Sequence, residues 1–141
     1  MRKPRAIIFD DEIILLTLFK RWMVQRGYEV LIFNEPKACQ LYAKHSDKCT
    51  QVYKCADVVI TDFNMPNMTG LEMLQIQHQR GCKLDVKQKA VISGDIESEN
   101  KKMIKEMGVS FFQKPLIIPD FSDWLSGCEE RMDLSAPLGN L

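Results

Sequence analysis

The 141-residue sequence lacks a net charge, because 19 Lys and Arg residues balance 19 Asp and Glu residues. It therefore offers no overall electrostatic attraction for nucleic acid or for an anionic membrane surface. No apolar stretch approaches the length of a membrane span, and the apolar run near the N-terminus stops at Phe9, too early for a signal-peptide core. We expect a cytoplasmic protein that binds neither nucleic acid nor membranes directly.

The sequence also lacks paired cysteine spacings of the kind that hold structural zinc. Its five cysteines are odd in number and irregularly spaced, and no CxxC pair occurs. Scattered reduced thiols are the simpler interpretation, with a metal or redox role for Cys49 and Cys55 as the alternative. Internal repeats and low-complexity segments are absent as well, so the length favours a single domain.

Short apolar runs alternate with segments of helical periodicity. The run Val58-Val59-Ile60 is β-branched and wholly apolar, which suits a strand buried on both faces of a parallel sheet. Strands are predicted at 5–9, 29–33, 58–60, 90–92 and 109–113, and helices up to about 26, from 34, from 69 to 79, from 96 to 107 and from about 119. This alternation predicts an α/β fold with a parallel sheet covered on both faces.

Helical spacing also predicts which side chains face the core. In the first helix these are Leu15, Leu18, Phe19, Trp22 and Met23, and in the fourth they are Ile96, Met103 and Met107. The segment 34–57 is long for one helix and a connection. A tolerated insertion is the simpler interpretation, and a partner-specific surface is the alternative.

Polar side chains follow four of the predicted strands. Asp10 and Asp11 follow the first strand, Asp62 the third, Ser93 the fourth and Lys114 the fifth. In a doubly wound sheet these strand ends share one edge, so the side chains converge. Three close carboxylates need a cation to offset their repulsion, and an all-oxygen ligand set favours Mg²⁺ or Mn²⁺. A lysine and a hydroxyl beside them suit a phosphoryl group, and an aspartate can be the nucleophile.

Each of these residues also has a plainer interpretation when taken alone. Asp10 or Asp11 could cap the first helix, Ser93 could be a turn residue, and Lys114 could be a solvated surface charge. Their joint placement at the strand ends favours a shared site for a cation and a phosphoryl group over these separate roles.

Four motifs follow one another along the chain: FDDE at 9–12, VVITDFNMPNMTG at 58–70, VISGD at 91–95 and FFQKPL at 111–116. Together and in this order they resemble the response-regulator receiver domain of two-component signalling, in particular its stand-alone, chemotaxis-type members. The resemblance implies a flavodoxin-like (βα)5 fold with a five-stranded parallel sheet in the order 2-1-3-4-5 and helices on both faces. We expect a receiver domain over residues 1–132 and a short C-terminal tail over residues 133–141.

The resemblance further implies how phosphate and metal are held. Asp62 would accept the phosphoryl group, and Lys114 would contact it. Mg²⁺ (or Mn²⁺) would be bound by Asp10, Asp11, Asp62 and the backbone carbonyl of Asn64.

Roles beyond the phosphate are implied in the same way. Ser93 would be the switch hydroxyl, and Phe111 matches the aromatic switch position, with a plain core role as the alternative. Asn64 and Asp95 would flank the route of hydrolytic water and tune the lifetime of the phosphate. Pro115 would follow the lysine through a bond that is usually cis in the family.

The implied function is a signalling switch that catalyses only its own phosphorylation and autodephosphorylation. The phosphoryl donor would be a sensor histidine kinase or a histidine phosphotransfer protein. An output protein would bind the surface formed by the fourth helix, the fifth strand and the last helix. The chain itself would be a monomer or a phosphorylation-dependent homodimer. Lys101, Lys102 and Lys105 on this surface indicate an acidic partner or simply a solvated helix face.

Three alternatives remain open from the sequence. The chain could be a receiver excised from a larger regulator or hybrid kinase, or a constitutive interaction module that is not phosphorylated. It could also be a haloacid-dehalogenase-like phosphatase, but those enzymes usually carry a second Asp two residues after the nucleophile, where this chain has Asn64.

Overall fold

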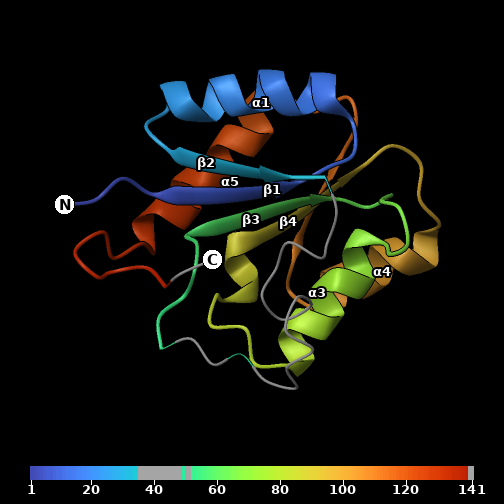
Figure 1. Ribbon diagram of the computed structural model, residues 1–141. Coiled ribbons are helices and arrows are strands. Elements are labelled where there is room, and N and C mark those ends of the chain that lie inside the picture. Colours follow the sequence, from blue (N-terminus) through green and yellow to red (C-terminus); the bar gives the residue numbers. More distant parts are fainter. Residues whose placement is uncertain (35–48, 50–51, 140–141) are drawn as a thin grey trace.

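Five parallel strands form one sheet at the centre of the molecule (Figure 1). The computed structural model describes residues 1–34, 49 and 52–139. The strands are β1 (Arg5–Phe9), β2 (Glu29–Phe33), β3 (Val58–Asp62), β4 (Lys89–Ser93) and β5 (Ser110–Gln113), in the order β2-β1-β3-β4-β5. In this register Ala6 of β1 lies between Val30 and Val58. The order and direction of the strands confirm the predicted flavodoxin-like fold.

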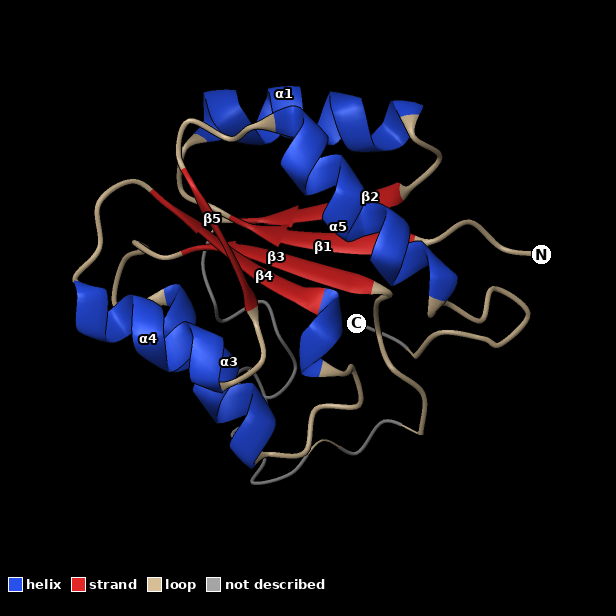
Figure 2. Cartoon of the chain, turned by 180° about the vertical axis from the view of Figure 1, so that it is seen from behind, coloured by secondary structure: helices blue, strands red, loops and turns tan. Residues whose placement is uncertain are grey.

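The described helices cover both faces of this sheet. They are α1 (Ile13–Gln25), α3 (Gly70–Gln79), α4 (Ser98–Glu106) and α5 (Ile118–Glu130), with a single 3₁₀ turn at Val86–Gln88 before β4. Helices α1 and α5 lie on one face, and α3 and α4 lie on the other (Figure 2). None of them is long and apolar enough to cross a bilayer. The helix predicted from Asn34 falls on residues 35–48, outside the described residues.

The sheet separates two hydrophobic clusters because neighbouring residues of a strand point to opposite faces. Ile60 packs with α1 and α5, whereas Val59 packs with α3 and α4. Every residue of β3 is buried, as predicted for a central parallel strand. Phe121 of α5 anchors the first cluster, with its ring centroid 5.1 Å from that of Phe19 and 5.2 Å from that of Phe112.

Two predicted core positions are wrong. Leu18 is 60% exposed, whereas Leu16 is buried. The two positions are about 200° apart around a helix, so they cannot share a face. In α4 the buried residue is Ile104, whereas Met103 is 38% exposed. Phe19, Trp22 and Met23 of α1 and Met107 after α4 do pack in the core clusters as predicted, so helical periodicity identifies most of the apolar face and misplaces its edge.

Residues 133–139 run beside the N-terminus. The Arg2 side chain donates to the carbonyl of Ala136 at 2.7 Å, and the Gly139 amide donates to the carbonyl of Lys54 at 2.8 Å. Arg2 also makes a bidentate pair with the wholly buried carboxylate of Asp57, at 2.6 and 2.9 Å. This network closes the end of the sheet where the strands begin, opposite the end where the polar residues gather.

Candidate functional site

The carboxyl ends of β1, β3, β4 and β5 and the loops that follow them form one polar site. Backbone hydrogen bonds tie these loops together: the Lys114 amide donates to the carbonyl of Ser93 at 2.7 Å, and the Phe63 amide donates to that of Ile92 at 2.9 Å. Because the loops are bonded to their neighbours at the sheet edge, the side chains that they carry are held on a rigid frame.

Three carboxylates gather in this frame. Oxygens of Asp10, Asp11 and Asp62 lie within 4.8 Å of one another. Asp62 at the end of β3 is buried, Asp10 is half-buried, and Asp11 is exposed. An all-oxygen set that opens to solvent on one side suits a hard cation such as Mg²⁺, which keeps several of its waters. The donor set therefore fits the ion expected from the sequence.

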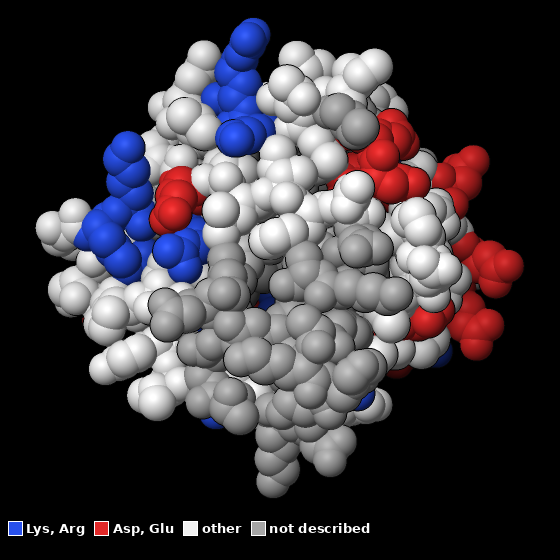
Figure 3. All heavy atoms as spheres, viewed as in Figure 1, with Lys and Arg blue, Asp and Glu red and all other residues white. Residues whose placement is uncertain are grey.

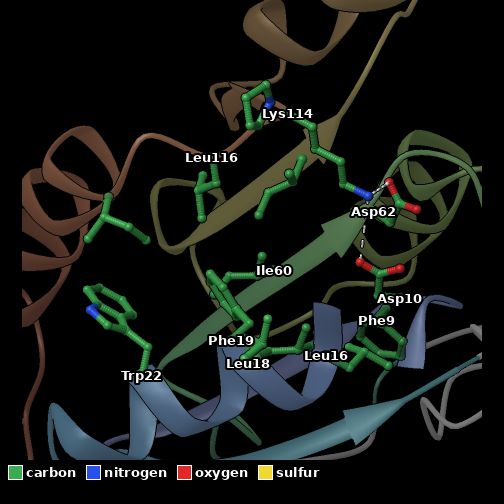
Figure 4. Close-up of a pocket in the computed structure, with 14 residues that line it drawn as sticks. Phe9, Asp10, Leu16, Leu18, Phe19, Trp22, Ile60, Asp62, Lys114 and Leu116 are labelled. Carbon is green, nitrogen blue, oxygen red and sulfur yellow. Dashed lines mark ion pairs between the residues drawn. The ribbon is translucent and has the colours of Figure 1, made fainter. Parts of the chain in front are cut away.

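Lys114 reaches the carboxylates from the loop after β5 (Figure 4). Its Nζ lies 3.4 Å from Asp62 Oδ1, 3.6 Å from Glu12 Oε1 and 3.9 Å from Asp10 Oδ2. The peptide bond from Lys114 to Pro115 is cis.

Glu12, the N-cap of α1, is a member of the site that sequence reasoning missed. The only signal for it was its place directly after the two aspartates.

The electrostatics of the site follow from burial and from crowding of like charges. Burial, Asp10 and Asp11 together raise the pKa of Asp62 to about 6, although Lys114 acts to lower it. Burial also raises the pKa of Asp10. For Lys114 burial acts to lower the pKa, but the carboxylates of Asp62, Asp10 and Glu12 outweigh it and the pKa is raised. The site is thus an acidic cluster with one firmly protonated lysine.

Ser93 at the end of β4 carries an unusual hydroxyl. It is wholly buried, and its Oγ has no hydrogen-bond partner among the described residues. A buried hydroxyl without a partner is costly and calls for an explanation.

Asn64 and Asp95, in the loops after β3 and β4, are both exposed.

Phe111 of β5 lies on the face of the sheet that packs against α3 and α4. Its ring is half-buried at the edge of that cluster, and Lys101 Nζ lies 5.1 Å from the ring centroid. This distance permits a cation–π contact between α4 and β5.

Gly70, the first residue of α3, is a second residue that sequence reasoning missed. Its amide donates to the carbonyl of Phe63 at 2.7 Å. A Cβ at this position would overlap the carbonyl oxygen of Asp62 and lie 2.9 Å from Thr61 Cγ2. Only glycine allows the start of α3 to approach the end of β3 this closely. The sequence showed the glycine but not the approach.

An apolar cavity of about 640 Å³ adjoins the acidic cluster (Figure 4). Side chains of α1 form one wall, the segment after Lys114 forms the other, and β3 passes behind. Asp10, Asp62 and Lys114 line only one end of it. The space extends from the site along the groove between α1 and the start of α5.

Charge is distributed along the strand direction. On the face that Figure 3 shows, Lys and Arg gather where the strands begin, and Asp and Glu gather where the strands end. A chain with no net charge thus presents an acidic end that attracts cations.

Comparison with known proteins gives a consistent result. A sequence profile of the response regulator receiver domain matches residues 6–123. The transcriptional regulatory protein FlgR of Helicobacter pylori is 31% identical over 111 residues, which are 78% of this chain and 25% of FlgR. The sensory/regulatory protein RpfC of Xanthomonas campestris is 25% identical over 128 residues, 89% of this chain and 16% of RpfC. The chain thus spans a quarter or less of these curated relatives.

Solved structures support the same fold. A response regulator receiver protein from Pseudomonas putida superposes with a TM-score of 0.72 at 20% identity, covering 90% of this chain and 98% of that one. The signal receiver domain of a putative LuxO repressor protein from Vibrio parahaemolyticus gives a TM-score of 0.74 at 16% identity, with 92% of each chain covered.

Proposed function

The chain belongs to the response-regulator receiver family, whose members are signalling switches, and we propose that it accepts a phosphoryl group on Asp62. The donor is a phosphohistidine on a sensor histidine kinase or a histidine phosphotransfer protein. The observation that carries the proposal is the position of Asp62 at the end of β3, crowded by Asp10 and Asp11 and 3.4 Å from Lys114.

Asp10, Asp11 and Asp62 would hold Mg²⁺, with the backbone carbonyl of Asn64 as a further ligand. Their carboxylate oxygens are close enough to share one ion. When bound, Mg²⁺ (or Mn²⁺) offsets the negative charge of the carboxylates and of the phosphoryl oxygens.

The chemical step is an in-line displacement at phosphorus. A carboxylate oxygen of Asp62 forms the new O–P bond while the N–P bond to the histidine breaks, and the imidazole nitrogen keeps the electron pair and takes up a proton. Lys114 donates to a phosphoryl oxygen and stabilises the charge there. Asp62 must be ionised to attack, and with its pKa at about 6 it is ionised at neutral pH.

Ser93 and Phe111 would transmit the change. The buried hydroxyl of Ser93 lacks a partner among the described residues, and a phosphoryl oxygen would provide one. Drawing Ser93 toward the phosphate would leave room behind it for Phe111 to pack inward. Because the Phe111 ring contacts Lys101, this movement would change the surface of α4, β5 and α5, where an output partner binds.

The lifetime of the phosphate would depend on Asn64 and Asp95. Both are exposed in the loops after β3 and β4, and in this proposal hydrolytic water would approach the phosphate between them. We assign this switch to the cytoplasm, without direct contact with nucleic acid or membrane, as a monomer or a phosphorylation-dependent homodimer. Protein partners alone would then read the phosphorylated state.

The test is phosphorylation by a small donor. Wild type, Asp62→Asn and Asp123→Asn are treated with acetyl phosphate, with Mg²⁺ or with EDTA, and analysed by intact mass. Asp123 is an exposed aspartate of α5 away from the site, so its variant is the matched control. We expect one added phosphoryl group, about 80 Da, in wild type and Asp123→Asn with Mg²⁺, and none in Asp62→Asn or in EDTA.

A rapidly hydrolysed phosphate would escape detection, so beryllofluoride is added in a parallel experiment. It should perturb the amide signals of Ser93 and Lys114 in the NMR spectrum of wild type only when Mg²⁺ is present. Absence of both the adduct and the beryllofluoride response would contradict the proposal and favour a constitutive interaction module.

A further inference from the structure

We propose that the apolar cavity beside Asp62 binds an amphiphilic small molecule with an aromatic or aliphatic body and a cationic amine head. The body would lie between α1 and the segment that follows Lys114. The head would pair with the carboxylates of Asp10 and Asp62. The ligand site shares Asp10 and Asp62 with the proposed phosphotransfer site, but the proposal does not depend on phosphotransfer taking place.

The size and the walls of the cavity suit such a body. Its volume of about 640 Å³ is within the range of roughly 300–1,000 Å³ that is typical of small-molecule sites. Leu16, Phe19 and Trp22 of α1 face Leu116 across the space, with Ile60 of β3 behind them (Figure 4). Contact with these side chains would stabilise an apolar ligand by removing its surface from water.

The cavity is also accessible. Leu18 and Ile118 line it and are 60% and 42% exposed, whereas Leu16 and Ile60 are buried. The cavity therefore runs from solvent to the core cluster. Large apolar side chains left exposed at the rim of an apolar space are typical of a surface that binds something.

The polar end determines the charge of the head. Asp10 and Asp62 line it together with Lys114, and Asp11 and Glu12 lie beside them, so carboxylates outnumber the one ammonium group. The same end of the molecule is acidic in the view of Figure 3. A cationic head offsets this charge and donates charge-assisted hydrogen bonds, whereas an anionic head would be repelled.

Competition with Mg²⁺ distinguishes this site from an apolar surface that binds hydrophobic molecules non-specifically. The amine head and Mg²⁺ would use the same oxygens of Asp10 and Asp62, so each should weaken binding of the other. A ligand of this class would therefore hold the protein in a metal-free form.

The test uses 4-phenylbutylamine as the probe and the full chain in EDTA. Binding is followed by the indole NMR signals of the two tryptophans, because Trp22 lines the cavity and Trp124 does not. We expect a saturable shift of the Trp22 signal with little change at Trp124. The alcohol 4-phenylbutanol and the acid 4-phenylbutyrate should bind about tenfold more weakly or not at all.

Substitutions and added Mg²⁺ show where on the protein the probe binds. Leu18→Ser should weaken binding about threefold or more, since it removes an apolar wall, whereas Ile14→Ser, on the same helix and 79% exposed, should not. Asp10→Asn should weaken binding of the amine but not of the alcohol. Mg²⁺ should raise the apparent dissociation constant of the amine in wild type.

Several results would overturn the proposal. They are no saturable shift at Trp22, equal binding of the amine and the alcohol, equal loss in the Leu18 and Ile14 variants, or binding that neither Mg²⁺ nor Asp10→Asn alters. Phosphorylation by acetyl phosphate, measured on Leu18→Ser, reports on the proposed phosphotransfer separately. A failed probe experiment with normal phosphorylation would therefore reject only the ligand site.

Discussion

Lys114 Nζ lies 3.4 Å from Asp62 Oδ1, so the loop after β5 places an ammonium group against the most buried carboxylate of the site. The contact lowers the pKa of Asp62 against the larger, opposing effects of burial and of Asp10. Lys114 therefore favours the ionised form of the proposed nucleophile, and in the proposed reaction it would also contact a phosphoryl oxygen.

Replacing Lys114 by alanine should slow phosphorylation by acetyl phosphate on the order of a hundredfold, because a charged donor to the transferring group is lost. Binding of Mg²⁺, followed by tryptophan fluorescence, should not weaken, since the lysine competes with the ion for the carboxylates. Lys102→Ala is the control, because Lys102 is exposed on α4 and pairs with Glu106. Equal phosphorylation rates for the two variants would show that Lys114 has no part in the transfer.

The raised pKa of Asp62 predicts how stability changes with pH in EDTA. Its folded-state pKa of about 6 lies above the unfolded value of 3.8, so the folded state binds the proton more tightly. The free energy of unfolding should therefore fall as pH rises from about 4 to about 6. Asp62→Asn should remove this contribution and be more stable than wild type at pH 7 by about 1–3 kcal/mol.

Urea unfolding of both proteins at several pH values measures this difference directly. Other groups titrate in the same range, so the quantity to follow is the stability of Asp62→Asn minus that of wild type. A difference that stays constant between pH 4 and pH 7 would mean that the carboxyl of Asp62 is not perturbed in the folded protein.

Mg²⁺ should reverse this destabilisation at pH 7. An ion that binds only the folded state adds about 1.4 kcal/mol to the free energy of unfolding at ten times its dissociation constant. We expect a rise in the melting temperature of wild type on addition of Mg²⁺, reversed by EDTA, and a much smaller rise in Asp10→Asn. Glu106→Gln, which removes an exposed carboxylate of α4, should respond as wild type does. A similar response of all three proteins would indicate non-specific binding.

The sequence predicted the strands and the residues that converge at their ends, because a parallel sheet brings every strand's carboxyl end to one edge. Asp10, Asp62 and Lys114 could be placed in this way without knowing any loop. The pairing of Glu12 with Lys114 could not, since it depends on how far the loop after β5 reaches across the sheet.

The spacing between packed elements could not be predicted from the sequence either. The apolar cavity exists because α1 and the segment after Lys114 stand apart, and no periodicity reports the distance between two elements. The exposure of Leu18, predicted to be buried, is part of the same feature, since this side chain lies at the rim of the cavity.

The pair of Arg2 and Asp57 should matter for stability rather than for signalling. Burial alone would raise the pKa of Asp57. Hydrogen bonds from Arg2 and from the Arg5 amide nevertheless hold this pKa below its usual range. Arg2→Ala should lower the free energy of unfolding by about 1–3 kcal/mol at pH 7. This loss is smaller than the loss expected when a buried carboxylate is left with no cation at all, because Lys54 Nζ also lies 3.4 Å from Asp57 Oδ1. Urea unfolding measures the effect.

This loss should shrink as the solution is acidified, since a carboxylate with a lowered folded-state pKa stabilises the protein above its unfolded pKa and loses that contribution as pH falls. Arg21→Ala, which removes an exposed arginine of α1, is the control. A defect of Arg2→Ala that persisted unchanged at low pH would point instead to the hydrogen bonds that the Arg2 side chain donates to the carbonyls of Ala136 and Asp133.

Two glycine substitutions should have opposite effects on stability. Gly70→Ala places a Cβ against the carbonyl oxygen of Asp62, so the start of α3 or the end of β3 must move, at a cost of about 1–3 kcal/mol. Gly127→Ala, inside α5, places a Cβ 3.7 Å from the flexible end of Arg131 and should stabilise the protein by up to about 1 kcal/mol.

Because the strain of Gly70→Ala acts on the backbone of Asp62, this variant should also respond more weakly to beryllofluoride and Mg²⁺, whereas Gly127→Ala should respond as wild type does. Loss of stability with a normal beryllofluoride response would mean that α3 moves and Asp62 stays in place, and Gly70 would then serve the fold alone.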